Sequence, residues 1–178
     1  MTDIYPAFDV SPVPVPGPDA RAPELFRGIY GMPMFVTVPT TDLAASTDFW
    51  VRGLGFFEFY SAPGQVVHLR RWMFQDVLLV PADPAAGAPA PGTGPALSVS
   101  FSCVLGQAGE IATACEELVP GCTTGPRPMP WGTVDVDVVT PENVRVTMTA
   151  AQPWDPDSAA ARNLRDVGID VGIDAPAE

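Results

Sequence analysis

The chain has 178 residues, a formal net charge of −12 and 47% hydrophobic residues. All nine of its basic residues are arginines, and a nucleic-acid partner is not expected, because phosphate backbones are bound by clustered cations. No apolar run approaches the roughly 18 residues needed to cross a bilayer, and the N-terminus has neither the basic start nor the apolar stretch of a signal peptide. We therefore expect a cytoplasmic protein with no membrane partner.

The first 25 residues predict an extended Pro-rich arm. Pro12, Pro14, Pro16 and Pro18 alternate there, and proline is poorly tolerated within helices and in the middle of sheets. The folded body is expected over residues 26–151. Residues 152–178 are expected to form an acidic tail, with a weak helical pattern around residues 159–167.

The first half of the body, residues 30–81, predicts the order strand, helix and three strands. Alternating apolar residues in "MFVTV" (34–38) indicate the first strand. The amphipathic run from Leu43 to Arg52 predicts a helix. Further strands are expected near residues 56–60, 66–70 and 77–80.

A linker rich in Pro, Ala and Gly is expected over residues 82–95, and the second half, residues 96–151, repeats the same order. "ALSVSFSCV" predicts a strand, and Ile111, Cys115 and Leu118 recur at helical spacing within a helix expected at about residues 110–119. Two strands follow near residues 133–139 and 144–149. The three cysteines include no CxxC pair and are expected to be structural thiols.

This repeated β-α-β-β-β order resembles the vicinal oxygen chelate superfamily, which includes glyoxalase I, extradiol dioxygenases, fosfomycin resistance enzymes and bleomycin resistance proteins. The resemblance is carried by "VPTTDLAASTDFWVRGLGF", "DVLLV", "SFSCVL" and "PWGTVDVDVVTPENVRVTM". It departs from the family's Asp-Pro-Asp-Gly turn, where this chain has "TPEN" (140–143). The resemblance implies an α+β fold, in which two β-α-β-β-β modules form curled mixed β-sheets around a cup with the helices outside. It also implies a homodimer, often one that exchanges modules.

Metal ligands in this superfamily stand on the first, fourth, fifth and eighth strands. The resemblance places the following residues at those positions: Phe35, Leu79 or Val80, Ser98 and Thr147. None of them offers the nitrogen, thiolate or carboxylate donors that transition metals prefer. The only histidine, His68, lies on the expected third strand, which does not normally supply a ligand. We therefore expect neither a metal nor another cofactor.

Because strand side chains alternate between two faces, the same positions predict which residues line the cup. The predicted ligand-binding residues are Phe35, Thr37, His68, Arg70, Ser98, Ser100, Ser102, Trp131, Asp135, Asp137, Arg145 and Thr147. Trp72 and Tyr60 are expected beside Trp131 at the rim, where aromatic rings suit a flat ligand. The same alternation is also typical of a polar sheet face that meets water.

Together these features favour a metal-independent small-molecule binding protein, similar to the bleomycin resistance proteins, that sequesters an aromatic, possibly cationic natural product in the cup. The alternative is a metal-independent lyase or isomerase in the same cup, with Asp135, Asp137, His68 or Arg70 handling protons or an oxyanion. The sequence contains no recognisable catalytic triad, phosphate loop or dinucleotide fingerprint.

Overall fold

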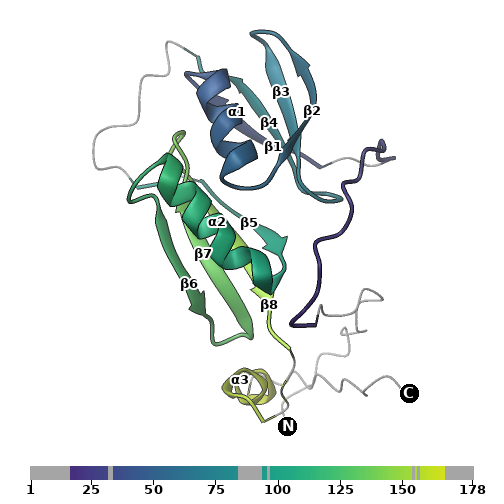
Figure 1. Ribbon diagram of the computed structural model, residues 1–178, viewed down its shortest axis with the longest axis vertical. Coiled ribbons are helices and arrows are strands. Elements are labelled where there is room, and N and C mark those ends of the chain that lie inside the picture. The colour runs from purple at the N-terminus through teal and green to yellow at the C-terminus, as the bar shows by residue number, and fades with distance from the viewer. Residues whose placement is uncertain are drawn as a thin grey trace.

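The computed structural model describes residues 17–31, 34–83, 94–95, 97–153, 155 and 157–166. Two four-stranded mixed sheets, ordered β1-β4-β3-β2 and β5-β8-β7-β6, carry the described fold (Figure 1). The elements are β1 (Val36–Thr40), α1 (Leu43–Arg52), β2 (Phe57–Ala62), β3 (Val66–Arg70), β4 (Asp76–Pro81), β5 (Leu97–Cys103), α2 (Leu105–Leu118), β6 (Thr123–Pro128), β7 (Thr133–Val139), β8 (Val144–Ala151) and α3 (Ala159–Asp166). The predicted α+β fold of two β-α-β-β-β modules is confirmed, but the two sheets do not close into one.

Helix α1 has the bounds that its sequence predicts. The Asp42 carboxylate accepts the backbone N–H groups of Ala44 and Ala45, both at 3.0 Å, and so satisfies donors left free at the helix start. At the other end, a Cβ on Gly53 would lie 2.7 Å from the Phe49 carbonyl oxygen and 2.9 Å from the Cys115 sulfur. A larger residue at position 53 would therefore push α1 away from α2.

Two elements of the second module differ from the prediction. Helix α2 begins at Leu105 rather than near residue 110. Its first turn contains Gly106, a weak helix former, and it lacks the usual polar residue at the cap, where Val104 stands. Strand β6 was not predicted, because its sequence "TTGPRP" contains residues that are disfavoured in strands. It is an edge strand with an irregular register against β7, the position at which prolines are tolerated.

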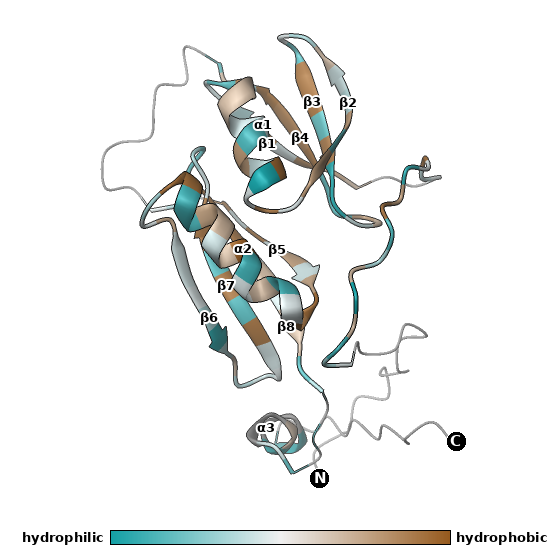
Figure 2. Cartoon of the chain, viewed as in Figure 1, coloured by the Kyte–Doolittle hydropathy of each residue, from teal (hydrophilic) through white to brown (hydrophobic). Residues whose placement is uncertain are grey.

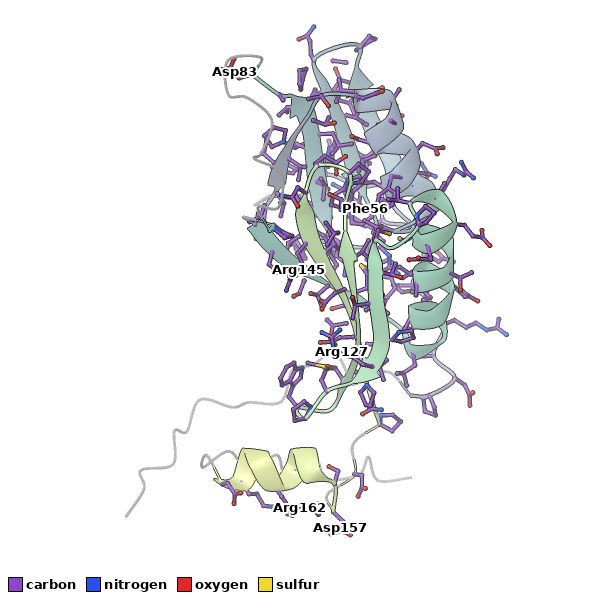
Figure 3. The ribbon with its side chains drawn as sticks, turned by 90° about the vertical axis from the view of Figure 1, so that its left-hand side faces the viewer. Phe56, Asp83, Arg127, Arg145, Asp157 and Arg162 are labelled. Atoms are coloured by element: carbon purple, nitrogen blue, oxygen red, sulfur yellow. The ribbon has the colours of Figure 1, made fainter. Side chains whose placement is uncertain are left out.

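The two modules share one hydrophobic core. Helices α1 and α2 cover the same side of the sheets, in front of them in Figure 1 and on the right in Figure 3. The buried residues of both modules form a single cluster, within which the rings of Phe56 and Phe101 meet edge to face with centroids 5.3 Å apart. The indole N–H of the fully buried Trp50 donates to the Glu142 carboxylate across the module boundary at 3.2 Å. The modules therefore pack as one unit.

The opposite face of each sheet, which we call its cup face, is covered by no helix of the described residues. Figure 2 shows hydrophobic and hydrophilic residues alternating along β7, as expected for a strand with one buried face. The turn between β7 and β8 is completed by Asn143 at a φ of 60°. Asparagine tolerates this left-handed conformation, so "TPEN" makes the turn without the family's glycine. Among the described residues, no helix is long and apolar enough to span a membrane.

Candidate functional site

The cup face of the second sheet consists of two rows of polar residues that cross three strands. Ser100 of β5 pairs with Thr147 of β8, which pairs with Asp137 of β7. The next row joins Ser102, Thr149 and Asp135 in the same way. The serines are exposed, so this face presents hydroxyl groups to whatever lies over it.

Hydrogen bonds hold both carboxylates of this face in place. Asp135, which is buried, accepts the hydroxyl groups of Thr133 and Thr149, each at 2.7 Å. Asp137 accepts the Thr147 hydroxyl at 2.7 Å. Its second carboxylate oxygen accepts the Arg127 guanidinium at 2.6 Å.

These contacts determine the charge of Asp137. Burial alone raises the pKa of its carboxyl group, but the hydrogen bonds from Thr147 and Arg127 and the charges of Arg127 and Arg145 outweigh burial and lower the pKa below its ordinary value of 3.8. Figure 3 labels the two arginines on the side of the sheet away from α2. Asp137 is therefore an ionised hydrogen-bond acceptor, and a weak base for proton abstraction at neutral pH.

The cup face of the first sheet is aromatic. The Phe35 ring meets the His68 ring edge to face, with centroids 5.3 Å apart, and the Phe59 ring lies 5.0 Å from His68 on a tilted plane. We call these three residues the aromatic wall. Phe59 is not among the predicted site residues. From the sequence, no faces are assigned to this strand, which changes register against β3 between Glu58 and Tyr60.

A buried ionic network stands beside the aromatic wall. One oxygen of Asp76 accepts both His68 Nε2, at 2.6 Å, and Arg70 Nε, at 2.7 Å. Arg70 and Asp76 are each only 2% exposed. Alternation alone predicts that the Arg70 side chain points freely into the cup. The structure instead holds its guanidinium within the protein.

Several solved structures share this fold. A mutant of the fosfomycin resistance protein FosX from Listeria monocytogenes aligns with a TM-score of 0.53 and 14% identity over 70% of this chain and 92% of that one. TioX from Micromonospora sp. ML1 aligns with a TM-score of 0.52 and 20% identity over 68% of this chain and 99% of that one. A glyoxalase/bleomycin resistance protein/dioxygenase from Nocardioides aligns with a TM-score of 0.50 and 21% identity over 72% of this chain and 88% of that one. The chain has the vicinal oxygen chelate fold. No family model matches its sequence, and neither does any curated protein.

The positions at which the resemblance places metal ligands carry no strong metal donor in this chain. Leu79 is fully buried on the helix side, so of the two candidate positions on β4 only Val80 lies on the cup face. The four residues at these positions are Phe35, Val80, Ser98 and Thr147. They offer two hydroxyl groups and two apolar side chains, a set without strong metal donors. Among the described residues, no three His, Cys, Asp or Glu side chains gather as a metal site.

The predicted site residues divide between the two sheets of this fold. Trp131 is separate from both, in the β6–β7 turn, where it is exposed. The cup face of the first sheet carries Phe35, Thr37, His68 and Arg70, and that of the second carries Ser98, Ser100, Ser102, Asp135, Asp137, Arg145 and Thr147. Of the other two predicted rim residues, Tyr60 is exposed and Trp72 stacks on Arg71.

A further concave surface lies on the helix side of module one. It is a groove of about 700 Å³ between α1 and the β2–β3 hairpin, and its floor includes Val51, Phe57 and Val67. None of the predicted site residues lines it. The groove is therefore separate from the two cup faces.

Proposed function

We propose that this chain is a metal-independent small-molecule binding protein, which sequesters an aromatic, cationic natural product between an aromatic face and a hydroxyl-rich face. The observation that carries the proposal is the division of the cup faces: the rings of Phe35, His68 and Phe59 on one sheet, and Ser, Thr and Asp side chains on the other. Rings stack on a flat ligand and attract cations, whereas fixed carboxylates and hydroxyl groups bind its polar groups.

The charge of the chain supports a cationic ligand. A net charge of −12 attracts cations over a range set by the ionic strength. The names of the similar proteins include both resistance proteins and enzymes, and the FosX structure contains Mn(II). The absence of strong donors at the corresponding positions favours binding without a metal.

We further propose that the protein acts as a homodimer. Within one chain the two sheets lie side by side (Figure 1) and do not close into a single sheet. A second copy would complete a closed cup, with the aromatic face of one chain opposite the hydroxyl-rich face of the other. Light scattering at micromolar concentration is expected to give the dimer mass, and a monomer would contradict this part of the proposal.

Native mass spectrometry of the protein purified from its own host tests the proposed function. A small molecule of constant mass that is released unchanged on unfolding supports sequestration. Prolonged incubation with that molecule is expected to return it unaltered.

A second candidate function, a metal-independent isomerase or lyase, is favoured by the 2.6 Å contact between His68 Nε2 and the buried Asp76. A carboxylate in this position orients an imidazole for proton transfer. A product that forms with the wild type and is lost in His68→Gln, while Asp137→Asn still forms it, would establish this function in place of sequestration.

A further inference from the structure

A segment ahead of the first module is bound to the cup face of the first sheet. We call residues 26–31 the strap. Arg70 Nη1 donates to the carbonyl oxygens of Phe26, at 3.1 Å, and Gly28, at 2.6 Å. A side chain of β3 thus holds the backbone of the strap at two points.

Tyr30 is the second attachment of the strap. Its hydroxyl donates to an Asp76 carboxylate oxygen at 2.9 Å and accepts the backbone N–H of Phe74 at 2.7 Å. Its ring stacks on the rings of Phe26 and Phe74, with centroids 5.4 and 4.7 Å apart. The strap is therefore held by polar and aromatic contacts together.

The strap also encloses the Arg70 guanidinium. The central guanidinium carbon lies 4.3 Å from the centroid of the Tyr30 ring, 4.1 Å from that of Phe59 and 5.5 Å from that of Phe26. Cation–π contacts of this kind strengthen when water is excluded. Two of the three rings come from the strap, so its docking removes Arg70 from solvent.

The same carboxylate connects the strap to the aromatic wall. One oxygen of Asp76 accepts a hydrogen bond from His68, a residue of the wall. The other oxygen accepts a hydrogen bond from Tyr30, a residue of the strap. Phe59 makes a parallel connection, since its ring contacts both His68 and Arg70. A change at the wall therefore reaches the strap through contiguous contacts.

We propose that the strap is part of the ligand site: it closes the aromatic wall at the Arg70 end, and its docking is coupled through Asp76 to ligand binding on the wall. The ligand class is a planar aromatic cation, which stacks on Phe35 and Phe59 and meets the strap at its edge. The coupling to a ligand rests on the proposed function, whereas the docking of the strap does not.

Limited trypsin digestion measures docking without a ligand. The chain has no lysine, so trypsin cleaves only at arginines. Arg27 is exposed but lies between the two carbonyl groups held by Arg70, and Arg21, ahead of the strap, is the internal reference. In the wild type, cleavage after Arg27 is expected to be much slower than after Arg21. Equal rates would overturn the docked strap.

Two variants are expected to loosen the strap while both residues of the buried ion pair, Arg70 and Asp76, are kept. Tyr30→Phe removes a hydrogen bond to a charged group and is expected to raise the Arg27 cleavage rate about tenfold, relative to Arg21. Gly28→Ala is expected to act in the same direction, because its Cβ would lie 2.5 Å from the tip of the Phe26 ring. Thr113→Val, which removes a hydroxyl group from an exposed position of α2, is the control and should leave the rate unchanged.

The link through Asp76 has its own measurement. His68 is the only histidine, so the imidazole region of a nitrogen–proton NMR spectrum reports on one residue. Tyr30→Phe is expected to shift the His68 ring signals. Unchanged signals would overturn the coupling between the strap and the wall.

Proflavine, a planar aromatic cation, tests the coupling to a ligand. Saturating proflavine is expected to slow cleavage after Arg27 further in the wild type, because a ligand stabilises the state that it binds. Tyr30→Phe is expected to bind proflavine at least about fivefold more weakly, whereas the affinity of Thr113→Val should equal that of the wild type. Equal affinities, or binding that leaves Arg27 cleavage unaltered, would overturn the strap as part of the site. If proflavine binds none of these proteins, the proposed ligand class is wrong, and the docking of the strap is decided by the Arg27 cleavage alone.

Discussion

Arg71, in the turn between β3 and β4, donates its guanidinium to the backbone carbonyl of Ser102 at the end of β5, at 2.6 Å. A second nitrogen donates to the Gln107 side chain at 2.7 Å. Arg71 is only 2% exposed, and burial lowers the pKa of its guanidinium. The guanidinium of Arg71, in the first module, therefore connects to the second module by hydrogen bonds to two uncharged oxygen atoms.

We predict that Arg71→Lys lowers the free energy of unfolding by about 1–3 kcal/mol, because an ammonium group cannot reproduce the two hydrogen bonds of the planar fork. Urea denaturation provides the measurement. Arg52→Lys is the matched control: Arg52 forms an exposed pair with Asp48 at 2.9 Å, and such pairs contribute about 0–1 kcal/mol. Equal effects of the two substitutions would contradict the role of Arg71.

The hydrogen bonds of Asp137 predict an acid-sensitive contribution to stability. Its pKa is lower in the folded chain than the ordinary value of 3.8, so the folded state binds fewer protons than the unfolded state. The stabilisation is complete above the unfolded pKa and is lost as the pH falls through the folded pKa. Urea denaturation at pH 7 and at successive pH values below 4 should show this loss.

The Asp137→Asn variant isolates this contribution. It is expected to lower the free energy of unfolding at pH 7 by about 1–3 kcal/mol, the usual effect of losing hydrogen bonds to a charged group. The difference in free energy of unfolding between Asp137→Asn and the wild type should then become smaller as the pH falls. Asp48→Asn, at an exposed residue of α1, should follow the wild-type acid profile. A constant gap between Asp137→Asn and the wild type at all pH values would refute the prediction.

The three thiols are predicted to be unreactive in the folded chain. Cys103, Cys115 and Cys122 are free and buried. Burial raises the pKa of Cys103 to about 11 and that of Cys115 to about 12, so at pH 8 these two residues hold almost no thiolate, the reactive form. Burial also raises the pKa of Cys122. Ellman's reagent should label no thiol in buffer and three in denaturant, with glutathione as the freely reacting control. Rapid labelling of the folded protein would show that a thiol is accessible.

The donor set of the cup predicts that the purified protein holds far less than one metal ion per chain. Elemental analysis is the direct measurement. Treatment with a chelator should leave the melting temperature unchanged, because no metal-linked stabilisation is then lost. One tightly held equivalent that disappears in His68→Ala would instead place the protein among metal-dependent enzymes.

Local signals in the sequence were sufficient for α1 and for strands β5, β7 and β8. Asp42 marks the start of α1, and strict alternation orients the serines of β5. Prediction failed where a local rule is broken: at Val104, where α2 starts without a polar cap residue, and in β6, whose prolines are tolerated at a sheet edge.

The strap could not be predicted for a different reason. Its contacts join residues far apart in the chain: Arg70 lies 42 residues from Gly28, and Asp76 lies 46 residues from Tyr30. No periodicity connects such partners. The alternation of β3 assigns Arg70 to the cup face, but it gives no indication that another segment covers this side chain.

The polar rows of the second sheet also restrict how its strands can pair. In β5, Ser98, Ser100 and Ser102 alternate with residues that face the helix. A slip of β5 by one residue against β8 would turn three hydroxyl groups into the apolar core and expose Phe101. A slip of β8 by two residues against β7 would keep the faces but separate Thr147 and Thr149 from the carboxylates that they now contact. The side chains proposed to bind the ligand thus also disfavour misaligned strands during folding, and substitutions that alter ligand specificity on this face are expected to reduce the yield of correctly folded protein.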